Sequence, residues 1–178
     1  MISDKAILPY NPTQEEMDAI LGDIFYEVQQ LFMASELVTN HPSLMNALLE
    51  SALLHMRVLL GFFEMPRRTA DHGQDPPIEK DDVLSIDFGF PVTQIAVDST
   101  YRERLNKDLA HLTYSRTSRL PECRDWPHRQ VVFPVLQRAI EFIEFLGPER
   151  RGQAKGVTPV EWDRLLDALK TYGRLHHQ

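Results

Sequence analysis

A polar stripe runs along residues 102–116, RERLNKDLAHLTYSR. Spacings of three and four place Arg104, Asp108, His111 and Ser115 on one face of a helix. A histidine exchanges a proton near neutral pH, and an arginine holds a phosphate through two parallel hydrogen bonds. Metal-free cleavage of RNA needs little more, because a base must activate the ribose 2′-hydroxyl and a cation must stabilise charge at phosphorus. Arg104 and His111 are therefore the candidate catalytic residues.

Neighbouring polar side chains extend this candidate site. Asn106, Lys107 and Arg116 are candidate substrate-binding residues, because amide and cationic groups bind phosphate oxygens. Asp108 would support the site by orienting and tuning the imidazole of His111.

The charge of this segment differs from that of the whole chain. Residues 101–119 contain five Lys or Arg against two Asp or Glu, whereas all 178 residues together carry a net charge of −7. The acidic total argues against a general electrostatic grip on nucleic acid or on an anionic membrane, but it leaves room for a local basic face. RNA or a nucleotide is therefore a candidate ligand at this segment.

The remaining composition bounds the class of protein. Apolar residues make up 43% of the chain and charged residues 25%, as in ordinary folded domains. The single cysteine, Cys123, excludes an internal disulfide and fits a reducing compartment. The first residues lack the pattern of a signal peptide, and no apolar run approaches the roughly 20 residues of a membrane helix, so we expect a cytoplasmic protein without membrane contact. No His, Cys and carboxylate residues have metal-ligand spacing, so we expect no metal and no other cofactor.

Clear start signals mark the first and last helices. Thr13 with Glu16, and Thr158 with Glu161, match the capping box in which each side chain binds the other residue's backbone N–H. Gly173 predicts the end of the last helix, since glycine commonly follows a helix C-terminus.

The second predicted helix, PSLMNALLESALLHMRVLLGFF, is apolar almost all round. Such a helix is usually buried on most sides, so we expect it at the centre of the bundle. His55 and Arg57 are supporting residues that need partners there. Arg57 would pair with Asp87 or Asp108, and His55 would line the cavity of His111. A satisfied polar network in the core is the favoured interpretation.

Residues 65–98 predict a long exposed loop, because their first half is rich in Pro, Gly and charge. The later stretch VLSIDFGFPV predicts a short helix or an extended segment packed on the bundle. Four phenylalanines are expected in the core rather than in a base-stacking surface: Phe62, Phe63, Phe88 and Phe90.

These patterns predict an all-α, up-and-down bundle of about five helices. The expected helices cover about 13–38, 42–63, 99–118, 129–147 and 158–173. Pro134 predicts a kink, or a helix that begins there, and Gly147 with Pro148 predicts the end of the fourth helix. Residues 1–178 would form a single domain, with a bundle core at about 13–146 and the last helix appended to it.

The segment Arg104-Leu-Asn-Lys-Asp-Leu-Ala-His111, on the third helix of a small bundle, resembles the R-x(4–6)-H motif of the HEPN superfamily. Together with LLHMRVLLGFF of the second helix, NKDLAHLTYSR is similar to bacterial proteins with HEPN-like bundles. The resemblance covers about residues 13–146. It implies an all-α fold, a homodimer and, in many members, metal-independent endoribonuclease activity with Arg104 and His111 in the site. Other members bind only nucleotides or partners. The interval of six residues is at the long end of the motif, and Leu105 stands where a polar residue is usual.

Two function classes remain open at this point. One is a HEPN-like endoribonuclease or RNA-binding domain that uses Arg104 and His111. The alternative is a non-catalytic helical module, a dimeric scaffold or a nucleotide- or protein-binding unit, that uses the same polar face for contact. An open cleft at Arg104 would favour the first class, and burial of this stripe would favour the second.

Overall fold

The computed structural model describes residues 10–38, 44–66, 81–106 and 126–176, which form helices and extended segments but no strand. The elements, in chain order, are α1 (Gln14–Val38), α2 (Met45–Glu64), the 3-10 helix η2 (Ser85–Phe88), α3 (Ser99–Arg104), α4 (His128–Arg151) and α5 (Pro159–His176). The predicted all-α bundle of five α-helices is confirmed.

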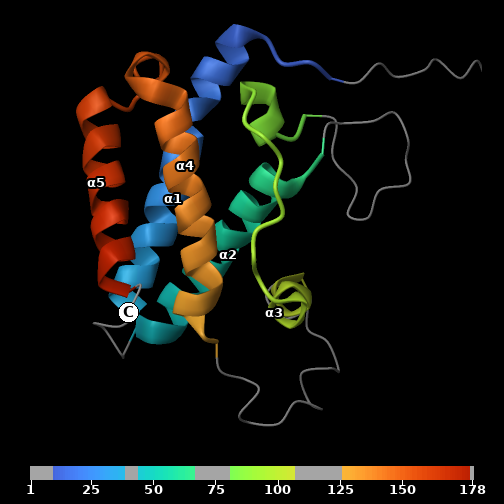
Figure 1. The fold of residues 1–178 in the computed structure, drawn as a ribbon, viewed down its shortest axis with the longest axis vertical. Coiled ribbons are helices and arrows are strands. Elements are labelled where there is room, and N and C mark those ends of the chain that lie inside the picture. The colour runs from blue at the N-terminus through green and yellow to red at the C-terminus, as the bar shows by residue number, and fades with distance from the viewer. Residues whose placement is uncertain (1–9, 39–43, 67–80, 107–125, 177–178) are drawn as a thin grey trace, which may run out of the picture.

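The four long helices run up and down beside one another (Figure 1). α2 returns antiparallel to α1, and α5 returns antiparallel to α4. α1 and α4 each contact all three of the other long helices, so these two helices form the centre of the bundle. The short α3 lies to one side, at the end of the segment that follows η2.

Interlocked phenylalanine rings form one end of the core. The ring of Phe142, from α4, meets Phe62 at a centroid distance of 5.1 Å and Phe90 at 5.3 Å, both edge to face. Phe63 and Phe88 pack on the same ring. Edge-to-face contacts of this kind contribute beyond simple burial, because the positive ring edge meets a negative ring face. The prediction that the phenylalanines of residues 62–63 and 88–90 are core residues is confirmed.

The segment 81–98 is held on the bundle by its own turn and by α4. Asp87 accepts a hydrogen bond from the backbone N–H of Leu84 at 3.0 Å, which closes η2. Gly89 then ends η2 with a φ of 79°, a left-handed conformation that suits glycine. Arg138 of α4 donates to the carbonyl of Pro91 and stacks over the ring of Phe90. The prediction of a short helix and extended chain packed on the bundle is confirmed.

Both capping boxes are present. Thr13 donates its backbone N–H and its hydroxyl to the Glu16 carboxylate, and Tyr10 donates its hydroxyl to the same group. At the start of α5 the Thr158 N–H and hydroxyl both lie 2.7 Å from a carboxylate oxygen of Glu161.

The prediction that the second helix is buried on most sides is wrong. Leu54 and Val58 of α2 are 51% and 46% exposed, and Leu44 and Met45 near its start are also exposed. One face packs on α1 and α4 while the opposite face lies outside the bundle, so an all-round apolar sequence reflects one core face and one exposed apolar face. The helix begins at Met45, and Asn40 and Pro42 lie outside the described residues.

The prediction that no apolar segment approaches the length of a membrane helix is also corrected by α2. α2 has 20 residues and is long and apolar enough to cross a membrane by length and composition alone. A core helix passes the same test, and the inner face of α2 does pack in the bundle. This criterion therefore gives only weak evidence for a membrane span.

The last two helices differ from their predicted boundaries. α4 begins at His128, ahead of Pro134, and keeps helical geometry until Gly147, where φ is 66° and ψ is 168°. One further helical turn follows this break. α5 continues through Gly173 to His176, so this glycine does not end the helix. An added Cβ there would make an ordinary contact with the ring of Phe133, at 3.6 Å.

α5 belongs to the same hydrophobic core as the other helices. Trp162 is completely buried, and its ring meets Phe25 of α1 at 4.9 Å. Leu165, Leu169 and Tyr172 continue this inner face at helical spacing. The helix is therefore packed into the bundle, where the sequence predicted an appended element.

Two glycines provide a matched test of the packing. In Gly22→Ala, the added Cβ would lie 2.6 Å from the backbone carbonyl oxygen of Lys155, so α1 and the chain before α5 must move apart. We expect a loss of about 1–3 kcal/mol in the free energy of unfolding, measured by urea titration. Gly61→Ala has no atom within 4 Å of its Cβ and should leave stability unchanged or raise it by about 0.5–1 kcal/mol. Equal effects would contradict the close approach at Gly22.

The capping box of α5 predicts a pH dependence. The backbone N–H and then the hydroxyl of Thr158 lower the pKa of Glu161 from 4.5. The stabilisation from this carboxylate is complete above the ordinary carboxyl pKa and is lost as the pH falls through the lower folded-state pKa. The melting temperature of Glu161→Gln should therefore lie below that of the wild type at neutral pH, and the difference should shrink on acidification. A difference independent of pH would show that the charge has no part in the cap.

Candidate functional site

Arg104 is buried at the end of α3. Only 6% of the residue is exposed, and its guanidinium carbon lies 4.1 Å from the ring centre of Trp126 and 5.7 Å from that of Tyr101. The two rings are themselves 5.9 Å apart. Asp98 caps the start of α3, because its side chain accepts a hydrogen bond from the N–H of Thr100. Tyr101 and Arg104 are three residues apart, so their side chains lie on the same face of this helix.

This environment differs from that of a phosphate-binding arginine. Phosphate recognition uses the planar fork of guanidinium N–H groups in an accessible position. In Arg104 the guanidinium is packed on aromatic rings, where a cation–π contact stabilises it. Among the residues that the structure describes, Arg104 is therefore buried and stacked on aromatic rings rather than exposed in a cleft.

The other residues of the predicted polar stripe are placed as follows. Asn106 is exposed, two residues after the end of α3. Lys107, Asp108, His111, Ser115 and Arg116 lie outside the described residues, as does the predicted continuation of the helix to 118. Of the proposed catalytic pair, the structure thus places Arg104 alone.

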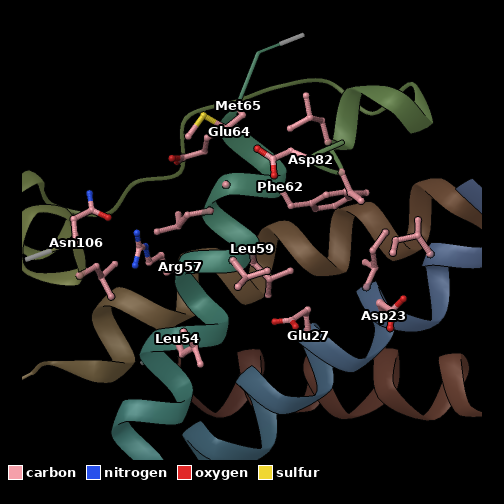
Figure 2. A pocket seen from close by; sticks show the side chains of 18 of the residues that line it. Asp23, Glu27, Leu54, Arg57, Leu59, Phe62, Glu64, Met65, Asp82 and Asn106 are labelled. Atoms are coloured by element: carbon pink, nitrogen blue, oxygen red, sulfur yellow. The ribbon is translucent and has the colours of Figure 1, made fainter. Parts of the chain in front are cut away.

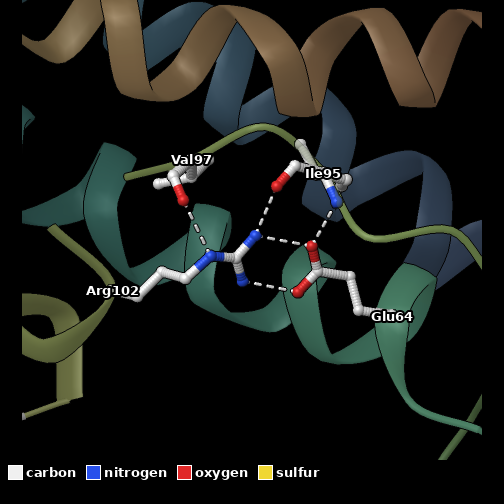
Figure 3. Close-up of polar contacts among 4 residues, drawn as sticks. All are labelled: Glu64, Ile95, Val97 and Arg102. Atoms are coloured by element: carbon white, nitrogen blue, oxygen red, sulfur yellow. Dashed lines mark hydrogen bonds and ion pairs between the residues drawn. The ribbon is translucent and has the colours of Figure 1, made fainter. Parts of the chain in front are cut away.

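Arg102 forms a polar cluster that the sequence did not predict (Figure 3). Its two terminal nitrogens donate to the two carboxylate oxygens of Glu64 at 2.6 and 2.7 Å. The same guanidinium donates to the carbonyls of Ile95 at 2.6 Å and Val97 at 3.0 Å. Glu64 also accepts the backbone N–H of Ile95 at 2.5 Å. We call these four residues the Glu64–Arg102 cluster.

The Glu64–Arg102 cluster changes the interpretation of the local basic charge. Arg102 and Arg104 were two of the five cations in residues 101–119. Arg102 is neutralised by a bidentate carboxylate, and Arg104 is buried against aromatic rings. The only sequence signal for Glu64 was an acidic residue closing an apolar helix, which does not identify a partner 38 positions away.

The polar residues of α2 also have assigned places. The Nδ1 atom of His55 lies 2.7 Å from a carboxylate oxygen of Glu27 on α1, and the imidazole ring meets Tyr26 edge to face. This is a satisfied polar pair, as the favoured interpretation predicted. Arg57 instead is exposed, and Asp87 binds the backbone of η2, so the predicted pair of Arg57 with Asp87 is wrong. The alternative partner, Asp108, lies outside the described residues.

A groove lies over the exposed side of α2 (Figure 2). It has a volume of about 980 Å³ and is bounded by α1, by residues 82–84, by Arg102 of α3 and by the two residues that follow α3. Apolar side chains line much of it, among them Ile20, Ile24, Leu54, Val58, Val83 and Leu105. Charged side chains contribute Asp23, Glu27, Arg57, Glu64, Asp82 and Arg102. We call it the α2 groove.

The groove shows no arrangement typical of a metal centre. Across the described segments, no group of three or more His, Cys, Asp or Glu side chains could hold a metal ion. Two of the carboxylates that line the groove already bind protein side chains, since Glu27 pairs with His55 and Glu64 pairs with Arg102. The groove is therefore described best as a mostly apolar surface with charged edges.

Comparison with protein-family models, with curated proteins and with solved structures gives no match to this chain. The geometry of the described residues is therefore the basis for a functional assignment.

The Glu64–Arg102 cluster predicts a strong effect on stability that depends on the geometry of the guanidinium and not on its charge alone. Arg102→Lys keeps the positive charge but loses the fork that binds the carboxylate and two carbonyls, so we expect a loss of about 2–3 kcal/mol in urea unfolding. Lys170→Ala is the matched control, because its pair with Glu144 is 2.6 Å long but lies on the surface. That variant should change stability by no more than about 0.5–1 kcal/mol. Similar losses in both variants would contradict a special role for the cluster.

Proposed function

We propose that this chain is a non-catalytic helical module that binds a protein partner through the α2 groove. The observation that carries the proposal is the exposed apolar side of α2. Leu54 and Val58 are four residues apart, so their side chains form one continuous apolar strip along the outside of the helix. We call these two side chains the α2 ridge.

An exposed apolar strip of this kind favours association. Burying Leu54 and Val58 under a partner would contribute about 25 cal/mol of binding free energy for each Å² of apolar surface removed from water. A contiguous apolar surface bordered by charged residues is typical of protein interfaces, where the centre is apolar and the rim is polar. The α2 groove has this organisation, because Asp23 and Arg57 lie at the edges of the ridge.

Electrostatics disfavours a polyanionic ligand in the groove. Asp23, Glu27 and Asp82 line it, and the whole chain carries a net charge of −7. RNA binding depends on cations that neutralise phosphates, and Arg102, the arginine of α3 that lines the groove, is already paired with Glu64. The groove therefore suits a protein surface better than a nucleic acid.

The buried environment of Arg104 supports the same choice between the two function classes. The endoribonuclease hypothesis needs Arg104 to reach a phosphate, whereas its guanidinium is stacked on Trp126. The resemblance to the HEPN superfamily remains compatible with our proposal, since that superfamily includes members that only bind partners.

A ribonuclease assay tests the proposal directly. Structured and single-stranded labelled RNA would be incubated with the folded wild-type chain in EDTA, beside a metal-independent ribonuclease as a positive control. We expect no cleavage above background by the wild type. Cleavage that leaves 2′,3′-cyclic phosphate ends, and that disappears in His111→Ala, would overturn the proposal and establish the endoribonuclease class. Circular dichroism of each protein would verify its fold.

A further inference from the structure

The two sides of the α2 ridge carry opposite charges. Figure 2 shows Arg57 on the side of α2 that faces Asn106, while Asp23 and Glu27 lie on α1, on the other side of α2. The α2 groove thus has an apolar strip with a positive edge, formed by Arg57, on one side and a negative edge, formed by Asp23 and Glu27, on the other. The other charged residues of the groove lie nearer the end of α2, where Glu64 is paired with Arg102 and Asp82 adds a further carboxylate.

Two of these charges have no partner within the described part of the chain. Asp23 and Arg57 are both exposed, and neither makes an ion pair or hydrogen bond with another described residue. Glu27 differs, because His55 already binds its carboxylate. Asp23 and Arg57 are therefore the groups available for contact with a partner.

Two copies of this surface, related by one particular two-fold axis, place opposite charges against each other. A two-fold axis lying in the interface and parallel to α2 brings the negative edge of one copy against the positive edge of the other, and brings the two apolar ridges together. An axis that lies in the interface but runs across α2 would instead place acidic edge on acidic edge. The charges thus select one of the two simple face-to-face arrangements.

From this self-complementarity we infer that the partner is a second copy of this chain. The inference rests on the proposed function and names its partner. Leu54 and Val58 of each copy pack on the same residues of the other, with the two α2 helices running parallel. Arg57 of each copy lies against Asp23 of the other. Closed two-fold assemblies of this isologous kind are the commonest soluble oligomers.

The charges also distinguish a second copy from a lipid surface. An anionic bilayer attracts Lys and Arg, but the acidic edge at Asp23 and Glu27 would face its head groups. A second copy satisfies both edges at once, because each supplies the opposite sign to the other.

Charge exchange provides the test. Sedimentation velocity and light scattering of the full chain, over a range of concentrations, should show a wild-type dimer. Arg57→Asp and Asp23→Arg should each weaken dimerisation about tenfold or more, because each places like charges across the interface. The double variant Asp23→Arg/Arg57→Asp restores both pairs with reversed sign and should recover dimerisation. Leu54→Glu should give a monomer.

Matched controls and folding checks keep the outcomes separate. Arg164→Asp and Asp167→Arg make the same kinds of change at exposed positions on α5 and should remain dimeric. Circular dichroism and thermal unfolding would verify that each variant folds, and recovery in the double variant cannot arise from misfolding.

Several outcomes would overturn the inference: a monomeric wild type at high concentration, a dimer insensitive to both charge reversals, or a monomer that sediments with vesicles of anionic phospholipid. A monomer that does not cleave RNA would overturn this inference while leaving a protein-binding module in place. A dimer that cleaves RNA would overturn the proposed function while supporting the two-fold contact.

Discussion

The pairing of Glu64 with Arg102 is the contact on which the arrangement around α2 depends. α2 ends at Glu64, and the next element, η2, begins at Ser85, so the local sequence of α2 does not fix how residues 90–98 approach it. The bidentate ion pair, with the backbone of Ile95 and Val97 bound to the same two side chains, determines that approach. α3 begins immediately afterwards, and its position follows from the cluster. Both the burial of Arg104 and the shape of the α2 groove therefore depend on one carboxylate at a helix end.

Local signals predicted the fold well. Capping boxes and apolar periodicity identify α1 and α5 because these depend on residues three or four apart. Properties set by distant neighbours could not be obtained in this way. The outward face of α2 has the same residue types as its core face, so the sequence cannot say which Leu is exposed. Gly173 has the residue type of a helix end, yet α5 continues through it to His176 and packs against other helices.

The candidate site was harder to predict for a related reason. Residue types and helical spacing put Arg104 on a polar stripe. Whether an arginine can bind phosphate or instead packs in the protein depends on the groups that surround its guanidinium. Trp126, which provides that surface, lies 22 positions further along the chain, beyond any helical spacing. The sequence did identify α2 as unusual, and it favoured a satisfied pair for His55. It could not indicate that the hydrophobic excess of that helix faces outward and combines with Asp23 and Arg57 in one surface.

The contact between Trp162 and Phe25 bears on how the protein acquires its structure during synthesis. α1 contacts the three other long helices, yet the aromatic ring that covers Phe25 is synthesised only with α5, after α2, α3 and α4 have been made. Until then, a nascent chain on the ribosome holds α1 with part of its inner face uncovered. Early helices in this position expose apolar surface that chaperones recognise and that aggregation exploits. The bundle is therefore complete only when α5, the last helix to be synthesised, covers the inner face of α1.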